Sequence, residues 1–334
     1  MKRLLVVRLG SLGDLVHALP AVASIRRALA DVEIDWLVDA VHEDFLSLVP
    51  ILTSVVRLDA PTPAAWVRVL GQLRARDYDA ALDFQGLVKS AALARLSGAR
   101  RVIGFDRRSL REAAAAPFYQ ERVLIPDGLH VIQKNLRLAA AIAGPMTDLL
   151  EFPIDTLQSA ALDSVRLMAP DGFVLINPGA AWPNKRWPPE RFGRLARWIH
   201  DRHGCRSIVL WGPGERALAE DVVRHSGGAA IEAPPTQLAD LVALGRAARL
   251  MVSGDTGPTH IAAAVGTPIV ALFGPTDPHR NGPWHREDVA LSRHERCDCH
   301  YERRCRRPPD GWCLGTIRDD DVQQAVAVRL KRHS

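Results

Sequence analysis

The first apolar run of the sequence ends in a loop that could carry chemistry, Arg8-Leu9-Gly10-Ser11-Leu12-Gly13-Asp14, and we expect a helix to begin at about Asp14. Glycines let the backbone approach a ligand, and free amides at the start of a helix attract an anion. An aspartate in this position could also accept a proton from an attacking hydroxyl. The alternative is a tight turn in which Asp14 only caps the helix.

A second loop with possible chemistry runs from Ser253 to Ala264, SGDTGPTHIAAA, and leads into a helix of small residues. We expect it to present the amides of Thr256 and Gly257 to a phosphate group. The alternative is simple capping by Asp255 or Thr256, with His260 satisfied in the interior.

A third loop, NPGAAWPNKRWP at 177–188, carries Lys185 and Arg186 between two tryptophans. Such a cationic pair could hold a leaving diphosphate, although most Lys-Arg pairs are solvated surface. Glu215, in the loop after the next predicted strand, could accept hydrogen bonds from ribose hydroxyls. It could equally be a partner of the helix dipole.

The elements around these loops alternate between short apolar runs and helical patterns, which predicts an α/β protein. We expect two doubly wound, Rossmann-like domains with parallel sheets that face a central cleft, and a linker within 142–171. The domains are predicted as 1–150 and 151–334. The expected strands are 4–7, 34–38, 54–58, 80–84 and 101–105, then 173–177, 207–211, 229–232, 250–253 and 269–273. The helices expected in the second half are 189–203, 215–225, 236–247, 257–265 and 319–331.

Length and composition agree with this organisation. A chain of 334 residues suits two domains, and 47% hydrophobic with 24% charged residues is typical of globular proteins. The net charge of +5 favours anionic partners, but no nucleic-acid recognition motif is present. The amino terminus lacks the apolar region of a signal peptide, and no apolar run is long enough to span a membrane. We therefore expect a cytoplasmic protein with at most peripheral membrane contact.

Two other kinds of site find little support. A dinucleotide fingerprint needs a third glycine after Gly13, where Leu15 and Val16 stand instead, so Asp39 is only a weak candidate for a ribose-binding acid. The run from Asp77 to Asp79 precedes a strand and is predicted to be a turn, not a metal motif.

Four of the five cysteines lie close together near the carboxyl end, at Cys297, Cys299, Cys305 and Cys313. Four thiols could bind zinc or iron tetrahedrally, but the spacing lacks the usual two-residue knuckles. Free or buried thiols are the preferred interpretation, and a structural metal is the alternative.

Taken together, these segments resemble glycosyltransferase family 9, the lipopolysaccharide heptosyltransferases. The most specific match is DTGPTH at 255–260 with ALFGPTDP at 271–278, together with the stretch from Arg8 to Asp14 followed by ALP at 18–20. The runs DFQGLVKSA at 83–91 and Arg111-Glu112 resemble the heptosyltransferase I branch. The cysteine-bearing tail resembles other members of the family more closely.

The resemblance implies a GT-B fold with an amino-terminal acceptor domain and a carboxyl-terminal donor domain. It implies inverting transfer of heptose from ADP-L-glycero-D-manno-heptose to a Kdo residue of Kdo-lipid A, without a cofactor, at the inner membrane surface. Catalysis would fall to Asp14 and Lys185. The implied donor residues are Ala180, Ala181, Lys185, Glu215, Asp255, Thr256, Gly257 and His260, and the implied acceptor residues are Gly13, Gln85, Lys89 and Arg111.

The arginines at 100, 101, 107, 108 and 111 are expected to form a cluster that binds the carboxylates and phosphates of the acceptor, or else a solubilising rim. Two alternative functions share the fold and donor site: another family 9 transferase, such as a heptosyltransferase II or one using a different nucleotide sugar, and a nucleotide-sugar epimerase. A nicotinamide dehydrogenase is disfavoured by the failed fingerprint.

Overall fold

The structure, a computed structural model, describes residues 1–60, 62–145, 149–307 and 312–331. The chain divides into two compact units, Met1–Asp155 and Thr156–Ser334. The stretch 142–171 is not all linker, because it contains helix α6 (Ala160–Met168). Ala161 and Val165 of α6 are buried, and the breakers before this helix masked its short apolar face.

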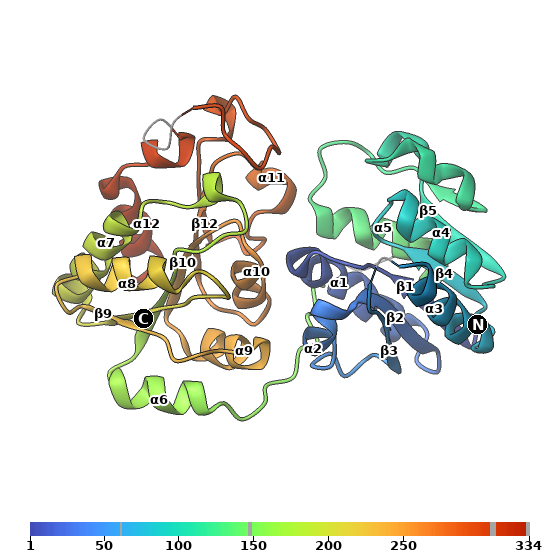
Figure 1. Cartoon of the computed structure of the whole chain (residues 1–334), viewed down its shortest axis with the longest axis horizontal. Helices are drawn as coiled ribbons and strands as arrows, with labels where there is room; N and C mark the ends of the chain where they lie inside the picture. Colours follow the sequence, from blue (N-terminus) through green and yellow to red (C-terminus); the bar gives the residue numbers. More distant parts are fainter. Residues whose placement is uncertain (61, 146–148, 308–311, 332–334) are drawn as a thin grey trace. The chain divides into compact units, whose positions relative to one another are not determined.

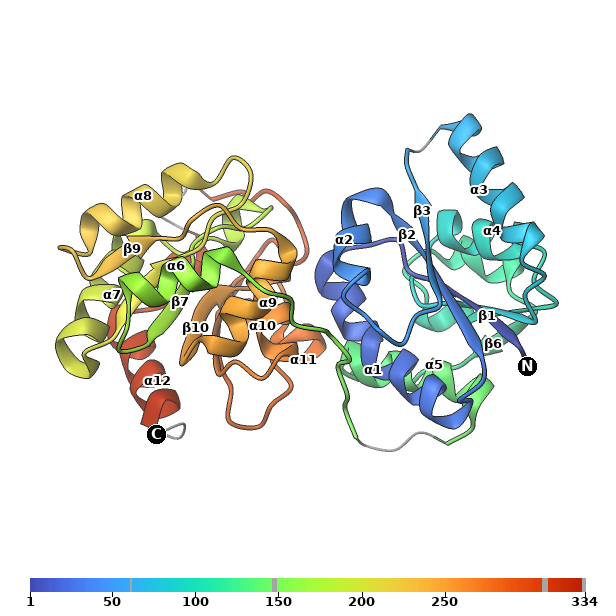
Figure 2. The same cartoon turned by 90° about the horizontal axis from the view of Figure 1, so that it is seen from below.

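Unit 1 is a parallel sheet in the order β3-β2-β1-β4-β5-β6 with helices on both faces (Figures 1 and 2). Its strands are β1 (Arg3–Val7), β2 (Glu33–Asp39), β3 (Ser54–Leu58), β4 (Ala80–Asp83), β5 (Arg101–Phe105) and β6 (Glu121–Val123). Its α-helices are α1 (Leu12–Ala28), α2 (Glu43–Leu46), α3 (Pro63–Ala75), α4 (Val88–Leu96) and α5 (Val131–Ala143). Strand β6 was not predicted, because it has three residues and only one of them is apolar.

Unit 2 repeats this plan in the order β12-β11-β10-β7-β8-β9. Its strands are β7 (Phe173–Asn177), β8 (Arg206–Val209), β9 (Ala230–Glu232), β10 (Leu250–Gly254), β11 (Ile269–Phe273) and β12 (Val289–Ser292). Its remaining α-helices are α7 (Pro189–His203), α8 (Arg216–His225), α9 (Leu238–Ala247), α10 (Gly257–Ala264), α11 (Pro278–Asn281) and α12 (Asp319–Lys331). The edge strand β12 was not predicted, whereas the other strands of this unit were.

Apolar side chains bury both faces of each sheet, which explains why the central strands are almost continuous apolar runs. In unit 1, α3 and α4 cover one face, and α1 packs beside α5. In unit 2, α7, α8 and α12 cover one face and α6, α9 and α10 the other. In each unit the chain builds the sheet outward from the first strand in one direction and then continues on its other side. The reversal lies between β1 and β4 in unit 1 and between β7 and β10 in unit 2. Ligands of doubly wound sheets bind at such reversals, next to the carboxyl ends of the strands.

Helix α1 begins at Leu12 and not at about Asp14 as predicted, and Ser11 is its N-cap. Asp14 is the third residue of the helix, and its carboxylate accepts a hydrogen bond from the Ser11 amide at 3.1 Å. This is the arrangement of a capping box, in which an acidic residue reaches back to the cap. No described helix is long and apolar enough to cross a membrane.

Candidate active site

Four loops of unit 2 leave the sheet at neighbouring carboxyl ends of strands. They follow β7, β8, β10 and β11, and the first three of them, together with the first turn of α10, carry every donor-side residue predicted from the sequence. Because the strands are parallel and adjacent, the loops share one edge of the sheet. The order of the sheet therefore explains how residues far apart in the chain come together.

Asp255, just after β10, is the centre of what we call the Asp255 cluster: Lys185, Asp255, His260, Thr276 and Asn281. Oδ2 of Asp255 accepts from Lys185 Nζ at 2.6 Å and from Thr276 Oγ1 at 2.8 Å. Oδ1 accepts from Asn281 Nδ2 at 2.8 Å and lies 3.2 Å from His260 Nε2. Four side chains thus converge on one buried carboxylate. Neither Asn281 nor a role for Thr276 was predicted, although DTGPTH and GPTDP follow the adjacent strands β10 and β11.

The charge of Asp255 is strongly stabilised. Burial by itself would raise its pKa, but the hydrogen bond from His260 and the charge and hydrogen bond of Lys185 outweigh burial and hold this pKa far below its usual range. The carboxylate therefore stays ionised and keeps the lysine ammonium in position. This role goes beyond the helix capping that was the alternative for Asp255.

Lys185 and Arg186 are not ordinary solvated residues, so that interpretation is wrong. The Lys185 side chain is 15% exposed, and its ammonium lies 4.5 Å from the centre of the Trp182 ring. Arg186 donates to the carbonyl of Ala180 from both Nε and Nη2, at 2.9 and 2.7 Å. Ala180 is buried and Ala181 is exposed. These contacts hold both side chains in place, so each has little conformational freedom to lose on binding an anion.

The start of α10 adjoins this cluster. Thr256 is the N-cap and makes no side-chain cap hydrogen bond; its hydroxyl instead accepts from Asn177 Nδ2 at 3.1 Å. The amide end of α10 therefore remains a place where an anion could bind. Gly254, at the end of β10, lets the loop after β7 come close, because a β-carbon at position 254 would lie 2.7 Å from the Lys185 carbonyl oxygen.

Glu215 lies at the same edge, as the N-cap residue of α8. Its carboxylate is 3.6 Å from Arg186 Nη2 and lies against Gly179, where a β-carbon would come within 2.1 Å of it. The glycine is required for this approach. Glu215 is thus held beside the loop after β7 and not turned to solvent, which suits a hydrogen-bond acceptor for a ribose.

In unit 1, three donors converge on a single oxygen of Asp14. Oδ2 accepts from Arg8 Nη2 at 2.6 Å, from the Ser11 amide at 3.1 Å and from the Ser11 hydroxyl at 2.9 Å. Burial by itself would raise the pKa of Asp14. The charges of Arg8 and His17 and the hydrogen bonds from Ser11 outweigh burial and keep this pKa far below its usual range. Arg8 also donates to the Phe84 carbonyl at 2.6 Å. Sequence reasoning missed its role, although Arg8 stands next to the glycine loop.

Gln85 links the loop after β4 to the loop after β1, because its Oε1 accepts from the Leu9 amide at 2.7 Å. The fully buried Asp83 fixes this loop through the Gln85 amide at 2.8 Å, the Ser90 hydroxyl at 2.8 Å and the Tyr119 hydroxyl at 2.7 Å. Burial raises the pKa of Asp83. Gln85 therefore fixes the loop after β4 to the loop after β1, and Gly13 is buried in the first turn of α1.

Asp39, the candidate ribose acid of a dehydrogenase, forms an ion pair with Lys89 at 3.1 Å. Asp39 ends β2 and Lys89 lies in the first turn of α4, so the pair joins two loops at the carboxyl edge of the sheet.

The predicted arginine cluster does not form as one group. Arg100 and Arg101 stand at the amino end of β5, where they pair with Asp77 at 2.9 Å and with Glu121 at 2.6 Å. The other three follow the carboxyl end of the same strand and are exposed: Arg107, Arg108 and Arg111. A five-residue strand, about 16 Å long, separates the two sets. The five arginines are close in the sequence, but they lie at opposite ends of one strand, so closeness in the sequence did not mean closeness in space.

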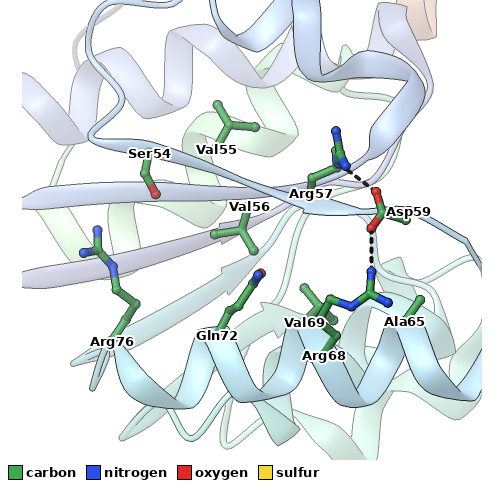
Figure 3. Close-up of a pocket in the computed structure, with 10 residues that line it drawn as sticks. All are labelled: Ser54, Val55, Val56, Arg57, Asp59, Ala65, Arg68, Val69, Gln72 and Arg76. Carbon is green, nitrogen blue, oxygen red and sulfur yellow. Dashed lines mark hydrogen bonds and ion pairs between the residues drawn. The ribbon is translucent and has the colours of Figure 1, made fainter.

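A pocket of about 500 Å³ lies away from these residues, between β3 and α3 in unit 1 (Figure 3). Its cations are already paired. Asp59 binds Arg57 at 2.6 Å and Arg68 at 3.3 Å, and Arg76 binds Asp35 at 2.8 Å. None of the predicted site residues lines it. We assign it no role in the chemistry.

Among the described residues, no group of three or more His, Cys, Asp or Glu side chains could hold a metal ion. The run Asp77-Tyr78-Asp79 lies in the connection between α3 and β4, with Asp77 at a φ of 48° and Asp79 accepting from the Lys2 and Arg3 amides.

Comparison with known proteins agrees with this architecture. The model of glycosyltransferase family 9 (heptosyltransferase) matches residues 66–309. A protein named lipopolysaccharide heptosyltransferase 1, from Pseudomonas aeruginosa, is 31% identical over 92% of this chain and 88% of its own length. Its namesake in Escherichia coli K12 is 30% identical over 83% of this chain and 89% of its own. The solved E. coli heptosyltransferase WaaC with ADP-2-deoxy-2-fluoro heptose is 25% identical, with a TM-score of 0.77 over 97% of this chain and 99% of that one.

Two doubly wound domains, each with a parallel six-stranded sheet, have the GT-B architecture of the solved heptosyltransferase. The chain belongs to glycosyltransferase family 9 (heptosyltransferase). The predicted family and fold class are confirmed.

Proposed function

We propose that the protein transfers heptose, with inversion, from ADP-L-glycero-D-manno-heptose to a Kdo residue of the lipopolysaccharide inner core, on a Kdo-lipid A acceptor. The observation that carries this proposal is the Asp255 cluster beside the amide end of α10, which presents a fixed ammonium where a diphosphate would bind. The relatives named lipopolysaccharide heptosyltransferase 1 and the E. coli structure with a fluorinated ADP-heptose support the choice of donor.

In this proposal unit 2 binds the donor. Lys185 and the amides of Thr256 and Gly257 receive the charge that develops on the departing ADP, which is where fixed donors accelerate a reaction most. Glu215 accepts from the ribose hydroxyls, and the amides of Ala180 and Ala181 border the diphosphate. Asp255 and His260 act on the donor through Lys185, as positioning residues.

Asp14 is the proposed general base. The donors from Arg8 and Ser11 converge on Oδ2, so we assign proton acceptance to Oδ1, the other oxygen of the carboxylate. The low pKa keeps Asp14 ionised at any physiological pH and fixes its orientation. It also makes Asp14 a weak base in the ground state, so proton transfer must accompany bond formation to the sugar.

Unit 1 is the proposed acceptor domain, with Gly13, Gln85, Lys89 and Arg111 on the acceptor side. Arg111 is exposed after β5 and could meet the acidic groups of Kdo-lipid A. The expected cleft between domains belongs to this proposal, as do a cytoplasmic location and peripheral contact with the inner membrane. Nucleic acid is not among the proposed partners.

The reaction is proposed to need no cofactor, because Lys185 and the helix amides supply the charge that a divalent cation provides elsewhere. Turnover should then persist in EDTA and should not rise when Mg²⁺ is added.

The test is nucleotide release from a panel of nucleotide sugars, measured with and without Kdo-lipid A, in EDTA and in Mg²⁺. We expect ADP release from ADP-heptose that depends on the acceptor and not on Mg²⁺. Acceptor-dependent release from another nucleotide sugar would indicate a different family 9 transferase. Conversion of the donor without any acceptor would indicate an epimerase and refute the proposal.

A further inference from the structure

Asp39 is the last residue of β2, and its carboxylate accepts a hydrogen bond from the Lys89 ammonium at 3.1 Å. Lys89 is an acceptor-side residue of the proposed reaction, whereas Asp39 has no part in it. Strands β2 and β4 lie on either side of β1 (Figure 1), and Lys89 lies in the first turn of α4, the helix that follows β4. The ion pair therefore spans the carboxyl end of β1, where the loop that leads to Asp14 begins.

The loops on both sides of this pair are fastened to the loop after β1. The Asp39 amide donates to the Leu9 carbonyl at 3.1 Å. From the other side, Gln85 Oε1 accepts from the Leu9 amide at 2.7 Å. His42, three positions after Asp39, lies on Gly10, because a β-carbon at position 10 would lie 3.0 Å from His42 Nε2. These contacts keep the ion pair close to the loop of the proposed base.

Helix capping, the ordinary role of an aspartate just before a helix, does not account for Asp39. It is the N-cap residue of the short 3-10 helix η1 (Ala40–His42), but its side chain makes no cap hydrogen bond. Aspartate is favoured at this position because its carboxylate accepts from the free amides of the helix. Here the carboxylate binds Lys89 on another element instead.

Helix stability does not account for Lys89 either. It is the second residue of α4, where the positive end of the helix dipole disfavours a cation, and the first turn of α4 contains no acidic residue. The long lysine stem is flexible, so its ammonium needs a partner to stay in one place. A carboxylate from a different strand supplies that partner. Such an arrangement suits a cation that is kept ready for an anion.

The pair is open to a ligand. The Lys89 and Asp39 side chains are 35% and 39% exposed, whereas those of Lys185 and Asp255 in unit 2 are 15% and 5% exposed. An ammonium has three N–H donors, of which Asp39 accepts one. The other donors of Lys89 are therefore suited to a carboxylate or phosphate of a ligand while Asp39 keeps the side chain in place.

We propose that Asp39 is a positioning residue for the acceptor: it holds the Lys89 ammonium across the end of β1, where Lys89 binds the carboxylate of the acceptor sugar. Fixing the lysine in advance reduces the conformational entropy that is lost when the acceptor binds. The inference rests on the proposed function for the identity of this sugar, Kdo. It adds a residue that acts through Lys89 and so favours an acceptor with a carboxylate.

The test is equilibrium binding of Kdo-lipid A in detergent micelles to the full-length protein, without donor. Asp39→Ala should weaken binding about two- to fivefold, as expected for an exposed ion pair. Lys89→Ala should weaken it roughly tenfold or more, because it removes a charged hydrogen-bond donor. Asp39→Glu keeps the carboxylate and should restore most of the affinity. Glu33→Ala is the matched control, because it breaks a similarly exposed pair with Arg3, 2.9 Å long, at the other end of β2, and it should bind like the wild type.

Two further readouts separate positioning from a general effect on the fold. In a protein that already carries Lys89→Ala, the change Asp39→Ala should weaken binding no further, because the two residues act as one unit. Lipid A without Kdo, which lacks the sugar carboxylate, should bind equally well to the wild type and to Asp39→Ala. If Asp39→Ala fails to fold, Asp39→Asn, which removes only the charge, serves in its place.

Unchanged binding in Asp39→Ala, or an equal loss whether or not Lys89 is present, would overturn the proposal. Tighter binding would overturn it too, because Asp39 would then compete with the acceptor for Lys89. Wild-type protein that binds Kdo-lipid A with the expected dependence on Asp39 but transfers no heptose would refute the proposed reaction alone. Wild-type protein that does not bind Kdo-lipid A would refute the proposed acceptor and this inference together.

Discussion

Lys185 Nζ lies 2.6 Å from Asp255 Oδ2, although 70 positions separate the two residues in the chain. The carboxylate is buried and ionised, and it holds the ammonium at the edge of the sheet where α10 begins. This pair joins the loop after β7 to the loop after β10, where we propose that the diphosphate of the donor binds. The first prediction concerns its cation.

Lys185→Ala should weaken ADP binding roughly ten- to a hundredfold, since a hydrogen bond to a charged group contributes about 1.5–3 kcal/mol. Calorimetric titration with ADP measures this. Lys134→Ala, which removes a lysine of unit 1, is the control and should bind ADP like the wild type. An unchanged affinity in Lys185→Ala would remove this lysine from the donor site.

Asp14→Asn should lower turnover by roughly 10²–10⁴-fold, the usual contribution of a general base. The amide can still accept the Ser11 hydrogen bond, so helix α1 should keep most of its capping. Initial rates with saturating donor and acceptor measure the loss, while ADP affinity should match the wild type. Near-normal turnover would mean that Asp14 only supports the helix and that the base lies elsewhere.

The partner of Asp14 leads to a prediction about pH. Arg8 lowers the pKa of Asp14, so Arg8→Gln should raise it toward about 3.9, the value of a free aspartate, or higher because the group is partly buried. Turnover in Arg8→Gln should therefore fall at a higher pH on the acid side than in the wild type. A pH–rate profile of both proteins decides this, and coincident acid limbs would show that Arg8 does not control the base.

The lowered pKa of Asp14 also makes the stability of the fold depend on pH. Because the folded-state pKa of Asp14 lies below its unfolded value, the Arg8–Asp14 pair stabilises the fold above about pH 4, and that contribution is lost as the pH falls through the folded-state pKa. In Arg8→Gln this contribution disappears. Its melting temperature should consequently be lower near neutral pH, and the difference from wild type should shrink toward pH 2.

The two ends of β5 give a matched pair of variants for the acceptor. Arg111→Ala should raise KM for Kdo-lipid A several-fold or more without changing ADP affinity, because Arg111 is exposed after the carboxyl end of the strand. Arg100→Ala should leave KM unaltered, because Arg100 pairs with Asp77 and Asp79 at the opposite end. Equal effects of the two changes would indicate general attraction to an anionic surface instead of a defined acceptor site.

Much of the fold followed from the sequence, because buried parallel strands are apolar runs that stand out from their surroundings. Helices α7 and α12 were predicted with the bounds that the structure gives them. Strands β6 and β12 and helix α6 were missed, because β6 has only one apolar residue in three, β12 has no buried residue, and chain breakers precede the short apolar face of α6. The start of α1 was misplaced by taking Asp14 for the cap instead of its capping-box partner.

The sequence predicted individual residues of the site but not the contacts between them. The loops that carry Lys185 and Asp255 were identified, yet the ion pair between them depends on the order of strands β7 and β10, which local pattern does not determine. Asn281 has no motif of its own, and its hydrogen bond to Asp255 became visible only in three dimensions. The separation of Arg100 from Arg111 likewise depends on which end of β5 each residue occupies.

The most direct test of the account is the product formed from ADP-heptose and Kdo-lipid A by the wild-type protein in EDTA. Mass spectrometry should show one heptose added to the acceptor, and NMR of the product should show that heptose joined to Kdo with the anomeric configuration opposite to that of the donor. An unmodified acceptor, a sugar added elsewhere than on Kdo, or a product that retains the donor configuration would contradict it.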